Sequence, residues 1–451
     1  MLSGKGARND GAFEVWASPE ATVARVDASR WVDQLALTGH DVRDGDVALL
    51  ASLGVAASRT PVLWERAAAA DPLDVDLTWA VRRAGALSAR GIDPIVTLLH
   101  HGSGPRYTDL LDPAFPALFA DYAETVARAL PAVRRWTPIN EPLTTARFST
   151  LYGVWYPNLR DDRAFGRALV HQTLAQQAAM ARIRALRPDA EFVLTEDLQR
   201  FTAGDAATHA YVDFLRERMY LSIELVAGRV DGRHPLAAFL IERCGVLRAE
   251  LDAMREGATT PDVVAFNHYP HSERYLFAAA DETIGDVPAV YVAGEDVPRV
   301  APLLIDAARR LRLPLALGEV HVRGTGDERV RWLAQHVEDA IAVRDAGVDL
   351  RAIGVWAAFG MTDWHSLLRD DGGVTEDGIF TFSGAGAVPQ PTVLAGAVRE
   401  LARTGSLASP AAPGWWERVD RFIAAEEMLA RRERGIPEGD HLVAKRILAR
   451  R

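Results

Sequence analysis

Short apolar runs recur along the chain and alternate with segments in which apolar residues have helical spacing. The plainest runs occupy residues 91–100, 191–195, 313–320 and 352–359. Continuous apolar runs of this length indicate strands that are covered on both faces, which is typical of a parallel sheet. Because such strands alternate with helices along the chain, we expect an α/β fold closed into a (β/α)8 TIM barrel.

The length of 451 residues would permit two or three domains, but a (β/α)8 barrel with loop insertions can occupy most of it as one. We expect residues 11–404 to form this single-domain barrel. Residues 405–451 are predicted to be a C-terminal helical extension that packs on the barrel. The longest insertion, residues 201–260, is expected to be helical and to form one wall above the mouth of the barrel.

The composition limits the partners and the location that we expect. The formal net charge of −10 argues against a nucleic-acid surface, which needs a concentrated cationic face, and favours a neutral small molecule. Cys244 is the single cysteine, which excludes an intramolecular disulfide and fits a reducing compartment. The first ten residues lack the apolar core of a signal peptide, and no run approaches about 18 apolar residues. We therefore expect a cytoplasmic protein without a membrane partner, with a homo-oligomer left open.

Two carboxylates stand at the ends of predicted strands. Glu141 closes the run W-T-P-I-N-E, which Pro142 interrupts, and Glu319 closes the apolar run at 313–320. Loss of water at the end of an apolar strand raises the pKa of a carboxyl group, as a general acid requires near neutral pH. Cleavage of a glycosidic bond uses such a pair, because one carboxyl protonates the leaving oxygen while the other faces the anomeric carbon.

The residues around both acids resemble a known family. W-T-P-I-N-E-P at 136–142 resembles the acid/base signature of the family 1 glycoside hydrolases, usually W-x-T-x-N-E-P. P-L-A-L-G-E at 314–319 is similar to their nucleophile strand, which usually ends T-E-N-G and here continues as V-H. The resemblance implies a retaining β-glycosidase that hydrolyses a glucoside-like substrate through a covalent glycosyl-enzyme intermediate. Glu319 would attack and Glu141 would serve as acid and then base, with the carboxyls about 5 Å apart.

Two further matches imply groups that support the nucleophile. Arg59 and Trp64 have the spacing of the family's R-F-S-x-x-W, whose arginine lies near both carboxylates. A buried arginine keeps its charge and stabilises an ionised nucleophile, whereas the alternative is a surface ion pair. Tyr269 lies in a stretch that resembles D-F-x-G-x-N-Y-Y, and its phenol could donate a hydrogen bond to Glu319. The alternative for that stretch is a simple turn.

The resemblance also implies contacts with sugar. Glu20 stands where the family usually has a glutamine, and Asp363 replaces the glutamate that binds the distal sugar hydroxyls, with a shorter reach. The alternative for Glu20 is a loop residue without a ligand, and the alternative for His100 is a histidine that caps a strand. Trp356 and Trp364 could instead be core residues. His101 is expected to be structural. The residues expected to bind or support the substrate are Glu20, Arg59, His100, Asn140, Asn267, Tyr269, Trp356, Asp363 and Trp364.

Other chemistries have less support in the sequence. There is no H-E-x-x-H run for zinc and no G-x-S-x-G run for a serine hydrolase, and no metal or organic cofactor is implied. Relatives that act on phosphorylated sugars usually carry a serine, lysine and tyrosine set, which residues 365–380 do not show. Glu196 and Asp197, at the end of another strand, are expected to be loop or supporting groups. A transglycosidase or a sugar-binding pseudoenzyme remains the alternative, and the natural sugar is undetermined.

Overall fold

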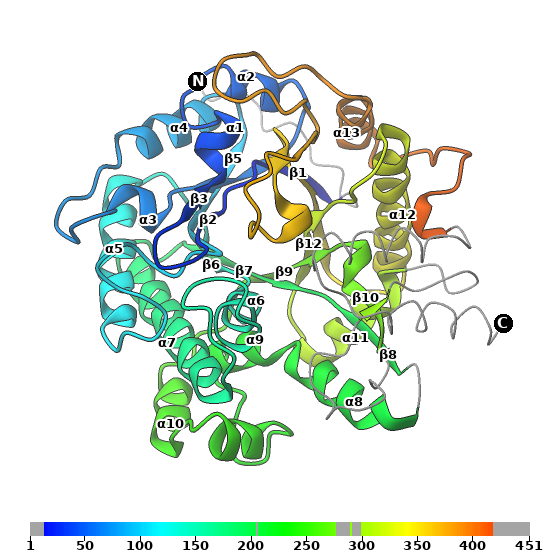
Figure 1. Cartoon of the computed structure of the whole chain (residues 1–451). Helices are drawn as coiled ribbons and strands as arrows, with labels where there is room; N and C mark the ends of the chain where they lie inside the picture. The colour runs from blue at the N-terminus through cyan, green and yellow to red at the C-terminus, as the bar shows by residue number, and fades with distance from the viewer. Residues whose placement is uncertain (1–12, 204–205, 277–288, 291–298, 418–451) are drawn as a thin grey trace.

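The structure is a computed structural model, and it describes residues 13–203, 206–276, 289–290 and 299–417. Eight parallel strands close into a barrel in the order β1-β13-β12-β9-β7-β6-β5-β4 (Figure 1). Each barrel strand pairs with the next barrel strand along the chain, and β13 pairs with β1 to close the ring, which confirms the predicted (β/α)8 barrel. The barrel strands are β1 (Glu14–Ser18), β4 (Ala57–Pro61), β5 (Asp93–His100), β6 (Arg135–Asn140), β7 (Glu191–Asp197), β9 (Val263–His268), β12 (Leu315–Val320) and β13 (Leu350–Trp356).

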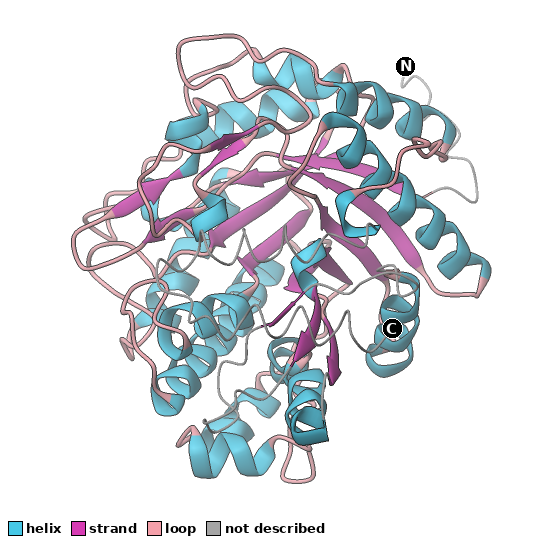
Figure 2. Ribbon diagram, turned by 45° about the vertical axis from the view of Figure 1, so that its right-hand side comes forward, coloured by secondary structure: helices cyan, strands magenta, loops and turns pink. Residues whose placement is uncertain are grey.

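Helices surround the barrel on its outer face (Figure 2). Their apolar stripes pack on the strands and on one another; for example, Phe119, Tyr122 and Val126 of α5 are buried at helical spacing in the layer that α5 shares with α7. The larger helices are α2 (Asp46–Ala51), α4 (Thr78–Ser88), α5 (Phe115–Ala129), α7 (Asp162–Leu186), α8 (His209–Arg218), α10 (Arg248–Glu256), α11 (Ala301–Leu311), α12 (Gly326–Asp345) and α13 (Val393–Thr404).

Shorter elements occupy the connections. Two-stranded and three-stranded sheets form at the loops, and several single helical turns follow the barrel strands. The short helices are α1 (Gln34–Thr38), α3 (Trp64–Ala67), α6 (Pro142–Ala146) and α9 (Leu221–Val226). The short strands are β2 (Val23–Arg25), β3 (Trp31–Asp33), β8 (Arg200–Ala203), β10 (Glu273–Leu276), β11 (Ala289–Val290), β14 (Met361–Thr362) and β15 (Thr375–Glu376). The single turns are η1 (Arg147–Leu151), η2 (Ala206–Thr208), η3 (Phe239–Arg243), η4 (Pro270–Ser272), η5 (Trp364–Ser366) and η6 (Trp415–Glu417).

Small side chains fill the inside of the barrel and let neighbouring strands approach closely. Ala57, Ala265, Ala316 and Ala352 form one buried cluster with Trp16. On β13, a Cβ atom added to Gly354 would lie 2.1 Å from the carbonyl oxygen of Gly318 on β12. Glycine is therefore required where these two strands meet, beside the end of β12 that carries Glu319.

The insertion at residues 201–260 differs from the expectation. Its described part contains the helices α8, α9 and α10, but β8 continues into it as far as Ala203 and pairs with β10. None of its described residues lines the cavity at the mouth of the barrel, so the prediction that it walls the pocket is wrong for this part of the chain. The reason is that α9 and α10 bury their apolar faces against α7, on the outside of the barrel.

The C-terminal extension packs on the barrel where the structure describes it. Trp416 is buried, with its ring 5.0 Å from that of Trp332 in α12, and its indole N–H donates to Gln335 Oε1 at 3.2 Å. Residues 418–451 and the start of the predicted barrel domain at 11–12 lie outside the described residues, so the division at residue 404 stays a prediction. Within the described ranges, no helix has both the length and the apolar character needed to cross a membrane.

Replacement of Trp416 by alanine tests whether the extension contributes to the stability of the barrel. We expect Trp416→Ala to lower the free energy of unfolding by about 3–5 kcal/mol, because a fully buried aromatic side chain is lost and a cavity remains. Urea unfolding followed by circular dichroism measures the change. Leu73→Ala is the control, because Leu73 is 92% exposed and its truncation should change stability by less than about 0.5 kcal/mol. Equal effects of the two substitutions would contradict the packing role.

Candidate active site

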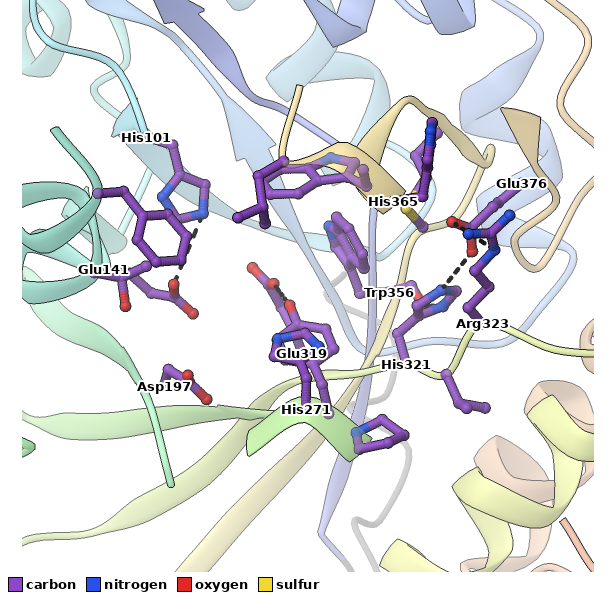
Figure 3. Close-up of a pocket in the computed structure, with 18 of the residues that line it drawn as sticks. His101, Glu141, Asp197, His271, Glu319, His321, Arg323, Trp356, His365 and Glu376 are labelled. Atoms are coloured by element: carbon purple, nitrogen blue, oxygen red, sulfur yellow. Dashed lines mark hydrogen bonds and ion pairs between the residues drawn. The ribbon is translucent and has the colours of Figure 1, made fainter. Parts of the chain in front are cut away.

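A cavity lies at the carboxyl ends of the barrel strands. Glu141 directly follows β6, Tyr269 follows β9, and Glu319 and Trp356 lie at the ends of β12 and β13. All four line the cavity together with Trp364, so the structure brings both sequence-predicted acids to one opening (Figure 3). This is the face of a (β/α)8 barrel on which active sites are found.

Glu319 is held by two donors from other segments of the chain. Arg59 on β4 is buried, and its Nη1 atom lies 2.5 Å from Glu319 Oε1. The phenol of Tyr269 donates a hydrogen bond to Glu319 Oε2. A guanidinium and a phenol directed at the two oxygens stabilise the ionised form and fix the orientation of the carboxylate. Both contacts are those that the sequence predicted.

The neighbours of Glu141, in contrast, favour the protonated form of its carboxyl group. Its backbone lies in the left-handed region, with φ of 45° at the corner between β6 and α6, and Asn267 Nδ2 donates to its Oε1 atom at 2.6 Å. Burial raises the pKa of Glu141 well above its usual value, and the charges of Asp197, Glu319 and Glu196 raise it further. The surroundings of Glu141 therefore favour its protonated form, as a general acid requires.

A polar layer beneath the cavity connects these groups. Asn140 accepts hydrogen bonds from Arg59 and from Thr195 through Oδ1, and its Nδ2 atom lies 3.2 Å from His100 Nε2. The amide can only donate there, so His100 Nε2 accepts and its proton resides on Nδ1. Burial lowers the pKa of His100 well below its usual value, and the charges of His101 and Arg59 add to this effect. His100 is therefore neutral.

Aromatic side chains form the other side of the cavity. The ring of Trp356 lies 6.0 Å from Tyr269 and 6.2 Å from Trp364, with an edge-to-face arrangement in both pairs. Within the described residues, the indole N–H of Trp356 is buried without a hydrogen-bond partner, whereas the indole of Trp364 is directed at the carboxyl group of Glu20. Apolar ring faces in the wall of the cavity suit a pyranose, which offers C–H groups on its faces.

Two predicted sugar contacts have a different environment from the one expected. Asp363 does not line the cavity: its carboxylate accepts from the backbone N–H groups of Gly373 at 3.0 Å and Val374 at 2.8 Å, which closes its own loop. Glu20 is fully buried beneath the cavity and accepts from the backbone N–H of Thr22 at 2.6 Å. Burial, with a smaller effect of the charge of Glu319, raises the pKa of Glu20 to about 7.

Several residues that line the cavity were not assigned to it from the sequence. His101, expected to be structural, has its Nε2 atom 3.8 Å from Glu141 Oε2, and burial lowers its pKa to about 3. Asp197 also lines the cavity and accepts from the hydroxyl of Ser272 at 2.6 Å, whereas Glu196 supports the backbone of Leu143. The available signal was their position at the ends of β5 and β7 that face the mouth of the barrel.

Comparisons with known proteins agree with this geometry. The model of the family "Glycosyl hydrolase family 1" matches residues 15–277, which is more than half of the chain. A 6-phospho-β-glucosidase of Dickeya chrysanthemi is 29% identical over 354 residues, which cover 69% of this chain and 73% of that protein.

Solved structures of similar fold include a family 1 β-glucosidase from Thermotoga maritima, with a TM-score of 0.71 and 18% identity over 89% of this chain and 100% of that one. A Thermotoga maritima family 1 glycoside hydrolase complexed with a cyclophellitol analogue has a TM-score of 0.72 and 18% identity over 88% of this chain and 99% of that one. At this identity the structures establish the likeness of fold alone. Since the family model spans most of the barrel strands and the acid at the end of β6, the chain belongs to glycosyl hydrolase family 1.

Proposed function

We propose that the protein is a retaining β-glycosidase, with Glu319 as the nucleophile and Glu141 as the acid and base. The observation that carries this proposal is that two buried carboxyl groups share one cavity while their neighbours favour opposite protonation states. Arg59 and Tyr269 stabilise the charge of Glu319, whereas burial and the nearby charge of Asp197 keep Glu141 protonated. This is the division of roles that retention requires.

The reaction follows from these two states. A carboxylate oxygen of Glu319 forms a bond with the anomeric carbon while the bond from that carbon to the leaving oxygen breaks. The proton of Glu141 moves to the leaving oxygen. Because the glycosyl ester of Glu319 is uncharged, one cause of the raised pKa of Glu141 disappears, and Glu141 can accept a proton from water. That water attacks the anomeric carbon and releases Glu319 as a carboxylate.

The proposed substrate is a neutral β-linked glycoside of glucoside type. The aromatic side chains of Trp356 and Trp364 line the cavity and would contact the glycone, with Asn140, His100 and Glu20 beneath them as supporting groups. Burial of His100 lowers its pKa well below its usual value, so His100 adds no positive charge that would favour an anionic sugar. The lone cysteine, Cys244, supports a cytoplasmic location as part of the same proposal.

A 6-phosphoglycosidase is the second candidate, because the similar protein from Dickeya chrysanthemi has that activity in its name. Arg274 and Arg323 line the cavity and could attract a phosphate. Against this, the carboxylate of Glu376 lies 3.7 Å from Arg323 and would repel a second anion. Comparison of aryl β-glucoside with its 6-phosphate decides between them: we expect the neutral substrate to have the higher kcat/KM.

Replacement of the proposed nucleophile tests the mechanism. We expect Glu319→Ala to lower kcat on an aryl β-glucoside by more than about a thousandfold, because the covalent intermediate cannot form. Added azide should restore release of the aryl group and give an α-glycosyl azide, since azide enters from the face that Glu319 vacates. Absorbance of the released phenol gives the rate, and NMR spectroscopy gives the anomer.

Glu141→Ala is the matched variant for this experiment. With an activated aryl leaving group it should still form the glycosyl enzyme, and azide should then give the β-glycosyl azide. The same anomer from both variants would contradict the assigned roles, and an inactive wild-type enzyme on all aryl β-glycosides would contradict the proposed function.

The pH profile tests the electrostatic part of the proposal. Asp197 in its charged form raises the pKa of Glu141, so Asp197→Asn should let Glu141 lose its proton at a lower pH. We therefore expect the alkaline limb of the kcat/KM profile to move to lower pH, as measured on an aryl β-glucoside. Asp306→Asn is the control, because its side chain is 70% exposed and its charge is screened. An unchanged or higher alkaline limb in Asp197→Asn would refute the assignment.

A further inference from the structure

We propose that His268 carries two protons and is a positioning residue, which closes the turn that places Tyr269 against Glu319. A chain of hydrogen bonds among buried groups on the outer side of β9 carries this inference. The number of protons on His268 does not depend on the proposed glycosidase function. The effect on Tyr269 rests on that function and adds a residue to the same site.

His268 is the last residue of β9, and its side chain points away from the cavity. Its two neighbours, Asn267 and Tyr269, donate hydrogen bonds to the two acids of the site. Successive side chains of an extended segment alternate between two faces, and Tyr269 continues the extended backbone with φ of −133°. His268 is therefore directed outward, where it is fully buried and its ring stacks on Trp332 of α12, with 5.6 Å between the ring centroids.

The hydrogen bonds on the α12 side show that Nδ1 of His268 carries a proton. His336 Nδ1 lies 2.8 Å from the carbonyl oxygen of Trp332, which can only accept, so this nitrogen of His336 is protonated. Burial lowers the pKa of His336 well below its usual value, so His336 is neutral and its Nε2 atom accepts. His268 Nδ1 lies 2.8 Å from that Nε2 atom and must therefore donate.

A second proton is needed on the other side of the same ring. His268 Nε2 lies 3.1 Å from Glu273 Oε1, and the proton of a neutral imidazole is already on Nδ1. Two lone pairs at this distance would repel each other, so a proton lies between them. Arg200 Nε lies 2.9 Å from Glu273 Oε2 and stabilises the ionised carboxylate. The proton consequently belongs to His268, which forms a buried imidazolium–carboxylate pair with Glu273.

The charged groups on the elements packed around this pair are compatible with an imidazolium. Arg200 of β8 shares the carboxylate, and Arg299, before α11, pairs with Asp339 of α12 at 2.5 Å, so these two charges offset each other. The imidazolium and Arg200 together therefore face one carboxylate. The indole on which the imidazolium stacks presents its face, which attracts a cation.

The imidazolium–carboxylate pair closes the turn that follows Tyr269. The backbone N–H of Ser272 donates to the carbonyl of Tyr269 at 2.9 Å, and the N–H of Tyr269 donates to the hydroxyl of Ser272 at 3.2 Å. His268 and Glu273 flank this turn, so their contact holds its two ends together. Without the second proton, Nε2 and Oε1 would repel, the turn would open, and the phenol of Tyr269 would move away from Glu319.

The number of protons on His268 can be measured directly. In protein with isotope-labelled histidine, nitrogen NMR spectroscopy at neutral pH should show both ring nitrogens of His268 protonated, with the signals assigned through their loss in His268→Gln. In Glu273→Gln the new amide can donate to Nε2, so this nitrogen should lose its proton. An unprotonated Nε2 in the wild-type protein would overturn the proposal.

His234 is the internal control for this spectrum. Its Nε2 atom lies 3.0 Å from Glu224 Oε2, so it also pairs with a buried glutamate. Its Nδ1 atom, however, accepts from the backbone N–H of Leu236 at 3.1 Å. One proton is enough for this pair, so His234 should show one protonated nitrogen where His268 shows two. The same protonation of both histidines would contradict the proton count.

Kinetics test whether His268 acts through Tyr269. His268→Asn keeps an amide near the place of Nδ1 but loses the donor to Glu273, whereas His268→Gln places an amide donor near Nε2. On an aryl β-glucoside we expect His268→Asn to lower kcat about tenfold or more, and His268→Gln to recover most of that loss. In the background of Tyr269→Phe, His268→Asn should lower kcat by less than about threefold, because the phenol is already absent. An equal factor in both backgrounds would overturn the positioning role.

His234→Asn is the matched control for the kinetics, because it removes a glutamate contact of the same kind away from the described lining of the cavity. Its kcat should equal that of the wild type. If His268→Asn does not fold, the spectrum of the wild-type protein decides. An enzyme that is inactive on all aryl β-glycosides would refute the proposed function and leave the proton count standing, whereas an active enzyme with a singly protonated His268 would refute this inference alone.

Discussion

The buried guanidinium of Arg59 is the contact on which the site depends. It lies within hydrogen-bonding distance of Glu319 on β12 and of Asn140 on β6, so one cation connects strands on opposite parts of the barrel. A carboxylate that is 2% exposed would be costly without such a partner. Arg59 compensates the buried charge of Glu319, whereas burial and the charges of neighbouring acids raise the pKa of Glu141.

Several elements of the fold and the site could be predicted from the sequence, because local patterns determine them. Each apolar run became a barrel strand, and acids at the ends of two runs met at one face, since all strands of a parallel barrel end on the same side. The contacts of Arg59, within β4, and of Tyr269, directly after β9, were implied by the resemblance to the family. The identity of the polar partners followed from the resemblance to the family.

Loop side chains could not be predicted in the same way, because their directions depend on contacts between distant segments. Asp363 lies in the left-handed region with φ of 53°, which directs its carboxylate to the N–H groups of its own loop. Glu376 reaches the cavity only because β14 and β15 pair, and the sequence of neither strand indicates this. His101 enters the cavity through a backbone φ of 57°, whereas regular strand alternation would have directed it away.

The backbone of Glu141 shows where function has been favoured over stability. A left-handed conformation costs a residue with a Cβ atom roughly 1–2 kcal/mol, and glycine would occupy the same corner without that strain. Folding alone would therefore select glycine between β6 and α6. The strain persists because the surrounding core holds this corner in place. The protein is therefore less stable than it could be, and in return its proton donor keeps a fixed position beside the bond that is cleaved.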